Sequence, residues 1–279
     1  MNFLMGMFRR FYRIFLMIPW LLYMAAESLP VTLRRNKWDA VNGMALKVRK
    51  WGKGLMRIFN IHIHCHGVTP LAGENREGML IVSNHLGYVD VFVHGALFGI
   101  RFAPKAEIRK WPILGLYTSF VHPVWVDRSS KMKSKKCVEE FRATLLNGVP
   151  LIVYPEGTST EGVEVLPFKS SLFDIVTDGE SRILPVVTRY RVPEGAVTPC
   201  WFGDISMGRH LWDFLAIPRI DADIYILPPV RSGTKERKEL ACQVQEKIAN
   251  ALQILLAGGD PLAEDANETP QSKKQGENE

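Results

Sequence analysis

A histidine and an aspartate with four residues between them form the pair in this sequence best suited to acid–base chemistry. His85 and Asp90 follow an apolar run at residues 79–82 that predicts a short buried strand, and residues 88–97 have the pattern of a helix. We expect His85 in the turn between them and Asp90 in the first helical turn, where the helix dipole favours an ionised carboxylate. Such a carboxylate can hold one imidazole nitrogen and leave the other as a general base. The alternative is a capped turn with a solvated histidine.

A second set of polar residues has the chemistry that an anionic substrate needs. Glu156, Gly157 and Thr158 follow another short buried strand, Lys169 comes soon after them, and Arg128 lies between the two sites. A guanidinium can hold a phosphate with two hydrogen bonds, and a glycine lets the backbone come close to a ligand. The alternatives are an ordinary surface ion pair for the arginine and a tight turn for the other segment.

These residues stand in the order found in the glycerolipid acyltransferase family, which includes the lysophosphatidic acid acyltransferases. The chain resembles this family over roughly residues 60–230, and its four sequence blocks match Asn84, His85 and Asp90; Asp127 and Arg128; residues 154–158; and the proline-bearing strand at residues 183–186. Two positions depart from the pattern. Gly87 stands where many members carry serine, which leaves the His/Asp pair intact. Ser159 stands where many carry arginine, so a cation is missing from the expected phosphate site. The identity of the acyl acceptor is therefore left undecided by the sequence.

The resemblance implies a membrane-associated O-acyltransferase that moves a fatty acyl group from an acyl thioester to a lysophospholipid hydroxyl. Lysophosphatidic acid would be the acceptor and phosphatidic acid the product, with His85 as the base and Asp90 as its orienting partner. The hydroxyl would attack the thioester directly, and the residues agree, since there is no GxSxG elbow and no serine or cysteine adjoins His85. Acyl-CoA or acyl-carrier protein would be the donor substrate, and no metal or other cofactor is expected. The alternatives are another lyso-acceptor, lysophospholipid or lyso-aminolipid, and a non-catalytic membrane-binding relative.

The expected substrate-binding residues surround this pair. Glu156 would position a glycerol hydroxyl or hold Arg128, and Thr158 would supply a hydroxyl group. Two lysines are further candidate cations. The full set that we expect to bind substrate is Asn84, Lys105, Arg128, Glu156, Gly157, Thr158 and Lys169.

Composition is that of an ordinary globular chain with reduced thiols. The 279 residues are 47% hydrophobic and 23% charged, enough for one large domain with appendages. The four cysteines are far apart and form no CxxC pair, which indicates a cytosol-facing protein rather than a disulfide frame or a zinc site. Histidines at positions 62, 64 and 66 alternate along a predicted strand and could present metal ligands, but we expect them to be exposed to water.

The N-terminal sixty residues combine positive charge with a short apolar run. They hold eleven Lys and Arg against two acidic residues, so the net charge of +6 arises there. Residues 14–26 are uncharged, but they are only 13 in number and Pro19 interrupts them, whereas a spanning helix needs about 20 apolar residues. We therefore expect an interfacial or re-entrant helix whose flanking arginines face anionic headgroups, namely Arg9, Arg10 and Arg13.

Residues 37–59 predict a basic amphipathic helix, with a core-facing helix and a solvated basic face as the alternative. Nucleic acid is not an expected partner, because the basic residues accompany an apolar segment and no nucleic-acid motif is present. A secretory signal is rejected, because Met24 falls where a small residue is wanted. We expect attachment to the cytoplasmic face of the inner membrane, monotopic or peripheral.

The rest of the chain alternates strand-like and helix-like runs, which predicts an α/β fold with a central mixed, largely parallel sheet flanked by helices. We expect three parts: membrane-associating helices at 1–60, the acyltransferase domain at 61–257 and a disordered acidic tail at 258–279. The predicted strands are residues 61–68, 79–83, 101–104, 123–127, 151–154, 183–189 and 222–227. The predicted helices are residues 88–97, 112–120, 131–147, 170–177, 210–216 and 235–256.

Overall fold

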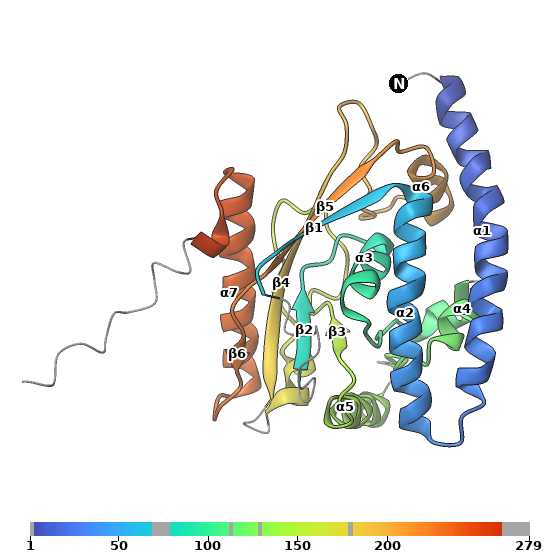
Figure 1. Ribbon diagram of the computed structural model, residues 1–279. Helices are drawn as coiled ribbons and strands as arrows, with labels where there is room; N and C mark the ends of the chain where they lie inside the picture. The colour runs from blue at the N-terminus through green and yellow to red at the C-terminus, as the bar shows by residue number, and fades with distance from the viewer. Residues whose placement is uncertain (1–2, 69–78, 112–113, 128–129, 178–180, 264–279) are drawn as a thin grey trace, which may run out of the picture.

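A mixed β-sheet lies between two layers of helices (Figure 1). The computed structural model describes residues 3–68, 79–111, 114–127, 130–177 and 181–263. Within these residues the sheet has six strands in the order β1-β5-β4-β2-β3, with β6 beside β4. They are β1 (Ile61–His66), β2 (Met79–Ser83), β3 (Leu151–Val153), β4 (Arg182–Arg191), β5 (Ile220–Ile226) and β6 (Val230–Arg231).

The central strand β2 is buried at all five positions. Met79 and Ile81 join the core on one face of the sheet, and Leu80 and Val82 join the core on the other. A strand covered on both faces needs the unbroken apolar run that its sequence shows. Strand β2 pairs in parallel with β3 and β4, β1 pairs in parallel with β5, and β4 is antiparallel to β5 and β6. The predicted fold class is confirmed.

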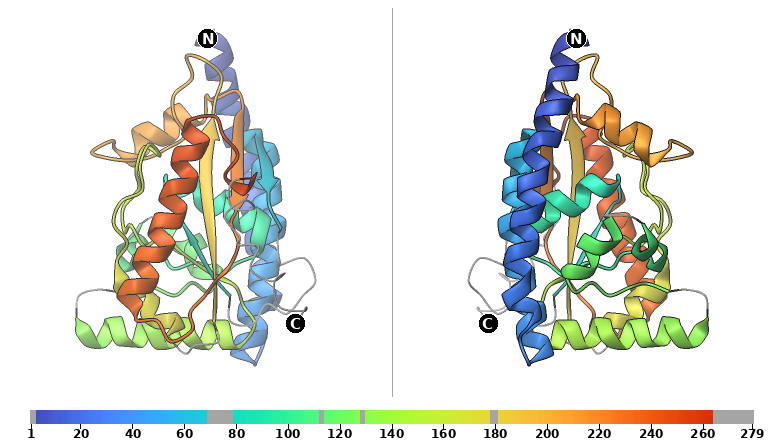
Figure 2. Two further views of the ribbon diagram at one scale, coloured as in Figure 1. Left: turned by 90° about the vertical axis from the view of Figure 1, so that its left-hand side faces the viewer. Right: turned by 90° about the vertical axis from the view of Figure 1, so that its right-hand side faces the viewer.

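Helices pack on both faces. One core holds residues of α1 (Phe3–Thr32), α2 (Lys37–Phe59), α3 (Tyr88–Phe98) and α6 (Met207–Phe214). The other holds residues of α5 (Lys131–Leu146), α7 (Arg237–Leu256) and the 3-10 helix η2 (Ser170–Val176). The remaining elements are the 3-10 helix η1 (Ala106–Lys110) and α4 (Leu114–Phe120). Figure 2 shows α5 at one end of the molecule and α6 near the opposite end.

Most predicted elements lie within about three residues of their expected ends. The strands predicted at 101–104 and 123–127 are wrong, because these segments form only isolated bridges, Arg101 with Leu151 and Lys105 with Val126. The segment predicted as a helix at 170–177 is a 3-10 helix, and β6 and η1 were not predicted. Residues 112 and 113 of one predicted helix, and positions 264–279 of the predicted tail, lie outside the described residues.

Helix α1 is continuous and contains Pro19, so the prediction that this proline interrupts it is wrong. A helix tolerates a proline when its neighbours hold the turn that loses a hydrogen bond. Here Trp20 packs on Gly54 of α2, where any Cβ atom would come 2.0 Å from the indole ring. By length and apolar composition α1 could cross a membrane. Its exposed apolar side chains include Phe3, Leu4, Phe8, Phe11, Phe15, Ile18 and Leu22.

The buried Arg13 of α1 binds protein carbonyls, so the prediction that it faces anionic headgroups is wrong. Arg13 is only 3% exposed. Its guanidinium donates to the carbonyls of Ile58 and Phe59 at the end of α2, at 3.2 and 2.7 Å, and to those of Leu215 and Ile217 after α6, at 2.9 and 2.8 Å. Carbonyls at a helix C-terminus lack partners within the helix and favour a cation. Two more arginines act likewise on the α6 end, Arg9 on the carbonyl of Ala216 and Arg10 on that of Trp212.

Helix α2 buries its apolar side in protein. Trp51, Leu55 and Phe59 belong to the same core cluster as the sheet, so the core-facing alternative describes this side of the helix. Its basic side is partly paired, since Lys47 and Lys50 each lie 3.0 Å from Glu27 of α1. The two helices are therefore joined by charge as well as by packing.

Arg13→Ala should lower the free energy of unfolding by roughly 3 kcal/mol, because four carbonyls lose a charged donor in a buried place. Arg9→Ala removes one partly buried bond and should cost about 1 kcal/mol. Denaturant unfolding of the full chain in detergent measures both. Equal effects of the two substitutions would contradict the assigned role of Arg13.

Candidate active site

The turn between β2 and α3 lies at the carboxyl end of a central parallel strand, where ligands of α/β proteins usually bind. Gly87 caps α3 with φ +143°, a conformation that side chains disfavour. A Cβ atom at this position would also come 2.9 Å from the backbone nitrogen of Trp201. The amide of Trp201 donates to the carbonyl of Leu86 at 2.7 Å. Glycine at this position, where many family members carry serine, leaves room for the backbone of Trp201 to approach the turn closely.

His85 and Asp90 meet as the sequence predicted, and the carboxylate is fully buried. Nδ1 of His85 lies 2.7 Å from Oδ2 of Asp90, which also accepts hydrogen bonds from the amides of Leu86 and Gly87 at 2.7 and 3.1 Å. Oδ1 accepts from the hydroxyl of Tyr190 at 2.7 Å. Burial by itself raises the pKa of Asp90, but the hydrogen bond from His85 and the electrostatic interaction with that imidazole, with a smaller contribution from the Tyr190 hydroxyl, hold that pKa below its ordinary value.

An ionised Asp90 fixes the tautomer of His85. Because the carboxylate accepts, Nδ1 carries the proton and Nε2 keeps its lone pair. The His85 side chain is 23% exposed, and its ring stacks on Tyr154 with centroids 4.2 Å apart. The imidazole is therefore held on one face and one edge, with a basic nitrogen left for a substrate.

Behind this pair, a buried polar chain links β2, α3 and β4. The Tyr154 hydroxyl lies 2.8 Å from Nδ1 of His94, whose Nε2 lies 2.8 Å from the Thr188 hydroxyl. The Asn84 amide accepts from the backbone nitrogen of Thr188 at 2.8 Å and donates to its carbonyl at 3.0 Å. Asn84, expected to bind substrate, thus holds β4 beside the turn. Burial lowers the pKa of His94 to about 4, so this histidine is neutral.

Glu156 binds the backbone of the His85 turn. Its Oε1 accepts from the amide of His85 at 2.7 Å and its Oε2 from the amide of Leu166 at 2.9 Å. Burial raises the pKa of Glu156 despite these two bonds. Both carboxylate oxygens are engaged in positioning the dyad and the loop that follows. The expected partner Arg128 lies outside the described residues.

Gly157, Thr158 and Lys169 lie together next to Glu156. Gly157 has φ +73°, and a Cβ atom there would come 2.1 Å from Nζ of Lys169, so the ammonium group lies directly over the glycine. Thr158 and Lys169 are exposed. The structure therefore joins this turn to the dyad through Glu156. Lys105 is exposed at the start of η1 on a separate segment, bridged to Val126.

The residues of this site that were not expected include His94, Thr188, Tyr190 and Trp201. Tyr190 lies a hundred positions after Asp90 in the chain. It reaches the carboxylate because β4 runs parallel to β2 with Val186 opposite Ser83, so that the next residues of β4 extend beside the turn. The one signal in the sequence is the alternation along residues 183–191, which places Val186, Thr188 and Tyr190 on one face.

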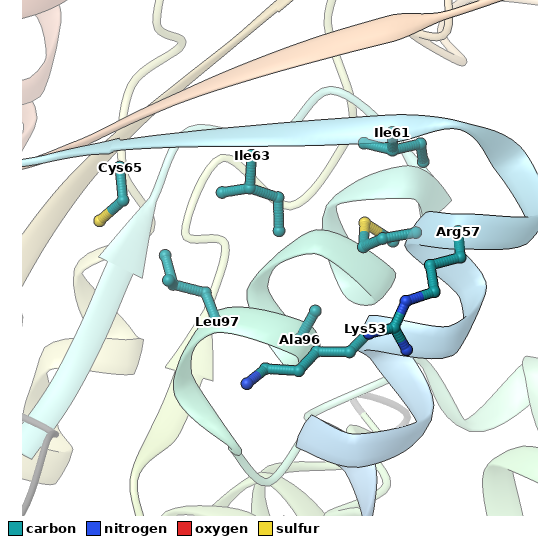
Figure 3. A pocket seen from close by; sticks show the side chains of 8 residues that line it. Lys53, Arg57, Ile61, Ile63, Cys65, Ala96 and Leu97 are labelled. Carbon is teal, nitrogen blue, oxygen red and sulfur yellow. The ribbon is translucent and has the colours of Figure 1, made fainter.

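A separate pocket of about 330 Å³ lies between α2, β1 and α3 (Figure 3). Its walls are apolar, and Lys53 and Arg57 of α2 border it. None of the expected site residues lines it. Of the β1 histidines, His64 pairs with Asp221 at 2.7 Å and His66 stacks on Tyr225. Within the described residues no group of three His, Cys, Asp or Glu is placed to hold a metal.

Known proteins are similar to this chain in sequence and in fold. The Acyltransferase family model matches residues 62–189. The lyso-ornithine lipid O-acyltransferase of Pseudomonas aeruginosa is 30% identical over 230 residues, 81% of each chain. The 1-acyl-sn-glycerol-3-phosphate acyltransferase of Neisseria gonorrhoeae is 26% identical over 200 residues, 71% of this chain and 77% of the relative. The crystal structure of PlsC, the LPA acyltransferase of Thermotoga maritima, superposes with a TM-score of 0.66 at 22% identity, over 90% of this chain and 96% of that one. This last likeness shows the fold.

His94 should make the fold sensitive to mild acid. The unfolded chain binds a proton at this residue near pH 6.5, whereas the folded chain binds it near pH 4. Acidification between these values therefore favours unfolding, and the free energy of unfolding should fall by roughly 2 kcal/mol from pH 7 to pH 5. Denaturant unfolding at both pH values should show this loss in the wild type and a correspondingly smaller one in His94→Gln. Equal losses in the two proteins would contradict a buried neutral histidine.

Proposed function

The chain belongs to the acyltransferase family, and we propose that it transfers a fatty acyl group from an acyl thioester to the free hydroxyl of a membrane lysolipid. The observation that carries this proposal is the dyad, in which a buried ionised Asp90 holds Nδ1 of His85 at 2.7 Å. The partly exposed imidazole keeps Nε2 as a base. An intact dyad argues against a non-catalytic membrane-binding relative.

In the proposed reaction, Nε2 of His85 takes the proton of the acceptor hydroxyl as its oxygen attacks the thioester carbonyl carbon. The resulting imidazolium is stabilised by the Asp90 carboxylate. The tetrahedral intermediate collapses with cleavage of the carbon–sulfur bond, and the imidazolium returns its proton to the leaving thiolate. The products are an ester and a free thiol, so the protein needs no covalent intermediate. We expect acyl-CoA or acyl-carrier protein as donor substrate, with no metal or resident cofactor.

Lysophosphatidic acid is the first candidate acceptor. The turn at Gly157 and Thr158 offers backbone and hydroxyl groups, and the ammonium of Lys169 lies over the glycine. A phosphate bound there would meet a cation next to the dyad, since Glu156 links this turn to the amide of His85 at 2.7 Å. Arg128, Lys105 and Asn84 remain predicted members of the site. The 1-acyl-sn-glycerol-3-phosphate acyltransferase of Neisseria gonorrhoeae supports this acceptor.

A lyso-aminolipid such as lyso-ornithine lipid is the second candidate, and Ser159 favours it. Where many family members carry arginine, the Ser159 hydroxyl donates to the carbonyl of Trp201, so this position supports the loop and brings no charge. The lyso-ornithine lipid O-acyltransferase of Pseudomonas aeruginosa is 30% identical to this chain over 230 residues, against 26% over 200 residues for the Neisseria enzyme.

We propose that α1 attaches the enzyme to the cytoplasmic face of the inner membrane without spanning it. Its exposed apolar side chains support contact with lipid. The opposite side of α1 packs along α2, and the buried guanidinium of Arg13 ties it to backbone carbonyls of the folded domain. A helix held along the domain in this way fits a monotopic arrangement better than a span.

His85→Ala should reduce acyl transfer by a factor on the order of 10²–10⁴, because the proton-transfer contribution of the base is lost. Asp90→Asn should also be severe, since an amide can reverse the imidazole tautomer. Purified variants are assayed with a labelled acyl thioester and a lysolipid, and circular dichroism checks the fold. His62→Ala, an exposed histidine of β1, is the matched control. Near-normal turnover of either dyad variant would contradict the proposed mechanism.

Lys169→Met tests the acceptor. Loss of a charged contact to phosphate, worth roughly 1.5–3 kcal/mol, should raise KM for lysophosphatidic acid at least about tenfold and leave KM for lyso-ornithine lipid unchanged. Lys238→Met, an exposed lysine of α7, is the control. An unchanged KM for lysophosphatidic acid would remove Lys169 from the site. Turnover of lyso-ornithine lipid alone would replace the first candidate acceptor by the second.

A further inference from the structure

Helix α6 and the loop before it present an apolar surface that no described part of the chain covers. Leu211 and Trp212 are 40% and 41% exposed, and Ile205 in the loop is 39% exposed. On the other side of this helix, His210 and Phe214 are buried one turn apart. The helix is thus amphipathic, with one side in the core and large apolar side chains turned outward.

This surface is continuous with the exposed side of α1. Phe11 of α1 packs edge-on against Trp212 with ring centroids 6.4 Å apart. The guanidinium of Arg10 lies 5.0 Å from the centre of the same indole and donates to the Trp212 carbonyl at 2.9 Å. Phe8 and Phe15 lie one helical turn to either side of Phe11. We call this shared surface the apolar ridge; it comprises Phe8, Phe11, Phe15, Ile205, Leu211 and Trp212.

The ridge is also braced against the candidate active site. The Tyr88 hydroxyl at the start of α3 donates to Nδ1 of His210 at 2.9 Å. The Trp201 indole donates to the carbonyl of Ile205 at 2.7 Å, and the Trp201 amide donates to the carbonyl of Leu86, next to His85, at 2.7 Å. These hydrogen bonds fix the orientation of the β2–α3 turn relative to the apolar ridge. Whatever the ridge contacts therefore has a defined position relative to the turn.

We propose that α6 and its preceding loop are a second lipid-contacting element, which together with α1 seats the β2–α3 turn at the bilayer surface. The proposal rests on the membrane attachment proposed above. An indole beside a guanidinium suits the boundary between acyl chains and headgroups. Arg209, two residues before Leu211 in the same helix, is exposed and adds a cation to α6. A lysolipid in the same leaflet would then reach His85 without leaving the membrane.

Leu211→Asp tests the ridge, and Leu146→Asp is the matched control. Leu146 is also an exposed helical leucine, but it ends α5 at the opposite end of the molecule. The full chain is floated with vesicles of phosphatidylcholine and phosphatidylglycerol. Leu211→Asp should partition about tenfold less than wild type, because an apolar contact is replaced by a charge. Its activity on lysolipid embedded in these vesicles should fall by a similar factor, while activity on a short-chain lysolipid dissolved as monomers stays unchanged.

A milder variant gives a second readout. Brominated phosphatidylcholine quenches tryptophan fluorescence only at close range. If Trp212 contacts lipid, its emission is quenched more strongly than that of the other tryptophans. The fraction of fluorescence that is quenched should therefore be smaller in Trp212→Phe than in the wild type. Equal or stronger fractional quenching in Trp212→Phe would mean that this indole is no closer to lipid than the other tryptophans, and it would overturn the inference.

The outcomes separate the two proposals. If wild-type protein does not float with the vesicles, the attachment proposed for α1 fails and the inference falls with it. If the wild type floats and Leu211→Asp behaves like Leu146→Asp, attachment stands and the role of α6 is overturned. If the protein is a dimer that Leu211→Asp converts to a monomer with unchanged flotation, a second copy covers the ridge and the lipid assignment is wrong.

Discussion

The buried carboxylate of Asp90 is the interaction around which this site is built. An unpaired charge away from water costs several kcal/mol, so a conformation that buries Asp90 must also bring its donors. The structure supplies four: the imidazole of His85, two backbone amides of the β2–α3 turn and the hydroxyl of Tyr190 on β4. The hydrogen bonds to this one carboxylate therefore hold the imidazole, the turn after β2 and the end of β4 in place. Glu156 holds the next loop in a similar way, because each of its carboxylate oxygens accepts a hydrogen bond from a backbone amide.

Arg13 plays the corresponding part with opposite sign. Its guanidinium collects carbonyls from the end of α2 and from the segment after α6, groups that a helix end leaves without partners. This side chain adds buried hydrogen bonds to the packing and the ion pairs that join α1 to the folded domain. The arginines thus satisfy protein carbonyls, and the apolar side chains of α1 are left to face outward. A membrane contact made by α1 is consequently transmitted to the domain as a fixed orientation.

The two buried charges are connected. Arg13 and Arg10 hold the end of α6, α6 holds Tyr88 through His210, and Tyr88 begins the helix whose first turn carries Asp90. The surface that we propose to contact lipid is in this way linked through α6 and α3 to His85, the proposed base. Both the acceptor hydroxyl and the catalytic nitrogen would then be confined to one boundary layer, which favours their encounter.

The sequence by itself determined the features whose partners are near in the chain. The apolar run of β2, the helix that follows it and the spacing of His85 and Asp90 lie within twenty residues, so local pattern was sufficient, and the bounds of α2 followed from its periodicity. Only the tertiary structure decided that Tyr190 completes the Asp90 site, that Asn84 binds the backbone of Thr188, that Pro19 lies within an unbroken helix and that the α1 arginines bind carbonyls. Those partners are separated by up to about two hundred residues. Their meeting depends on strand register and helix packing, which the local sequence does not specify, although alternation along a strand does indicate which side chains share a face.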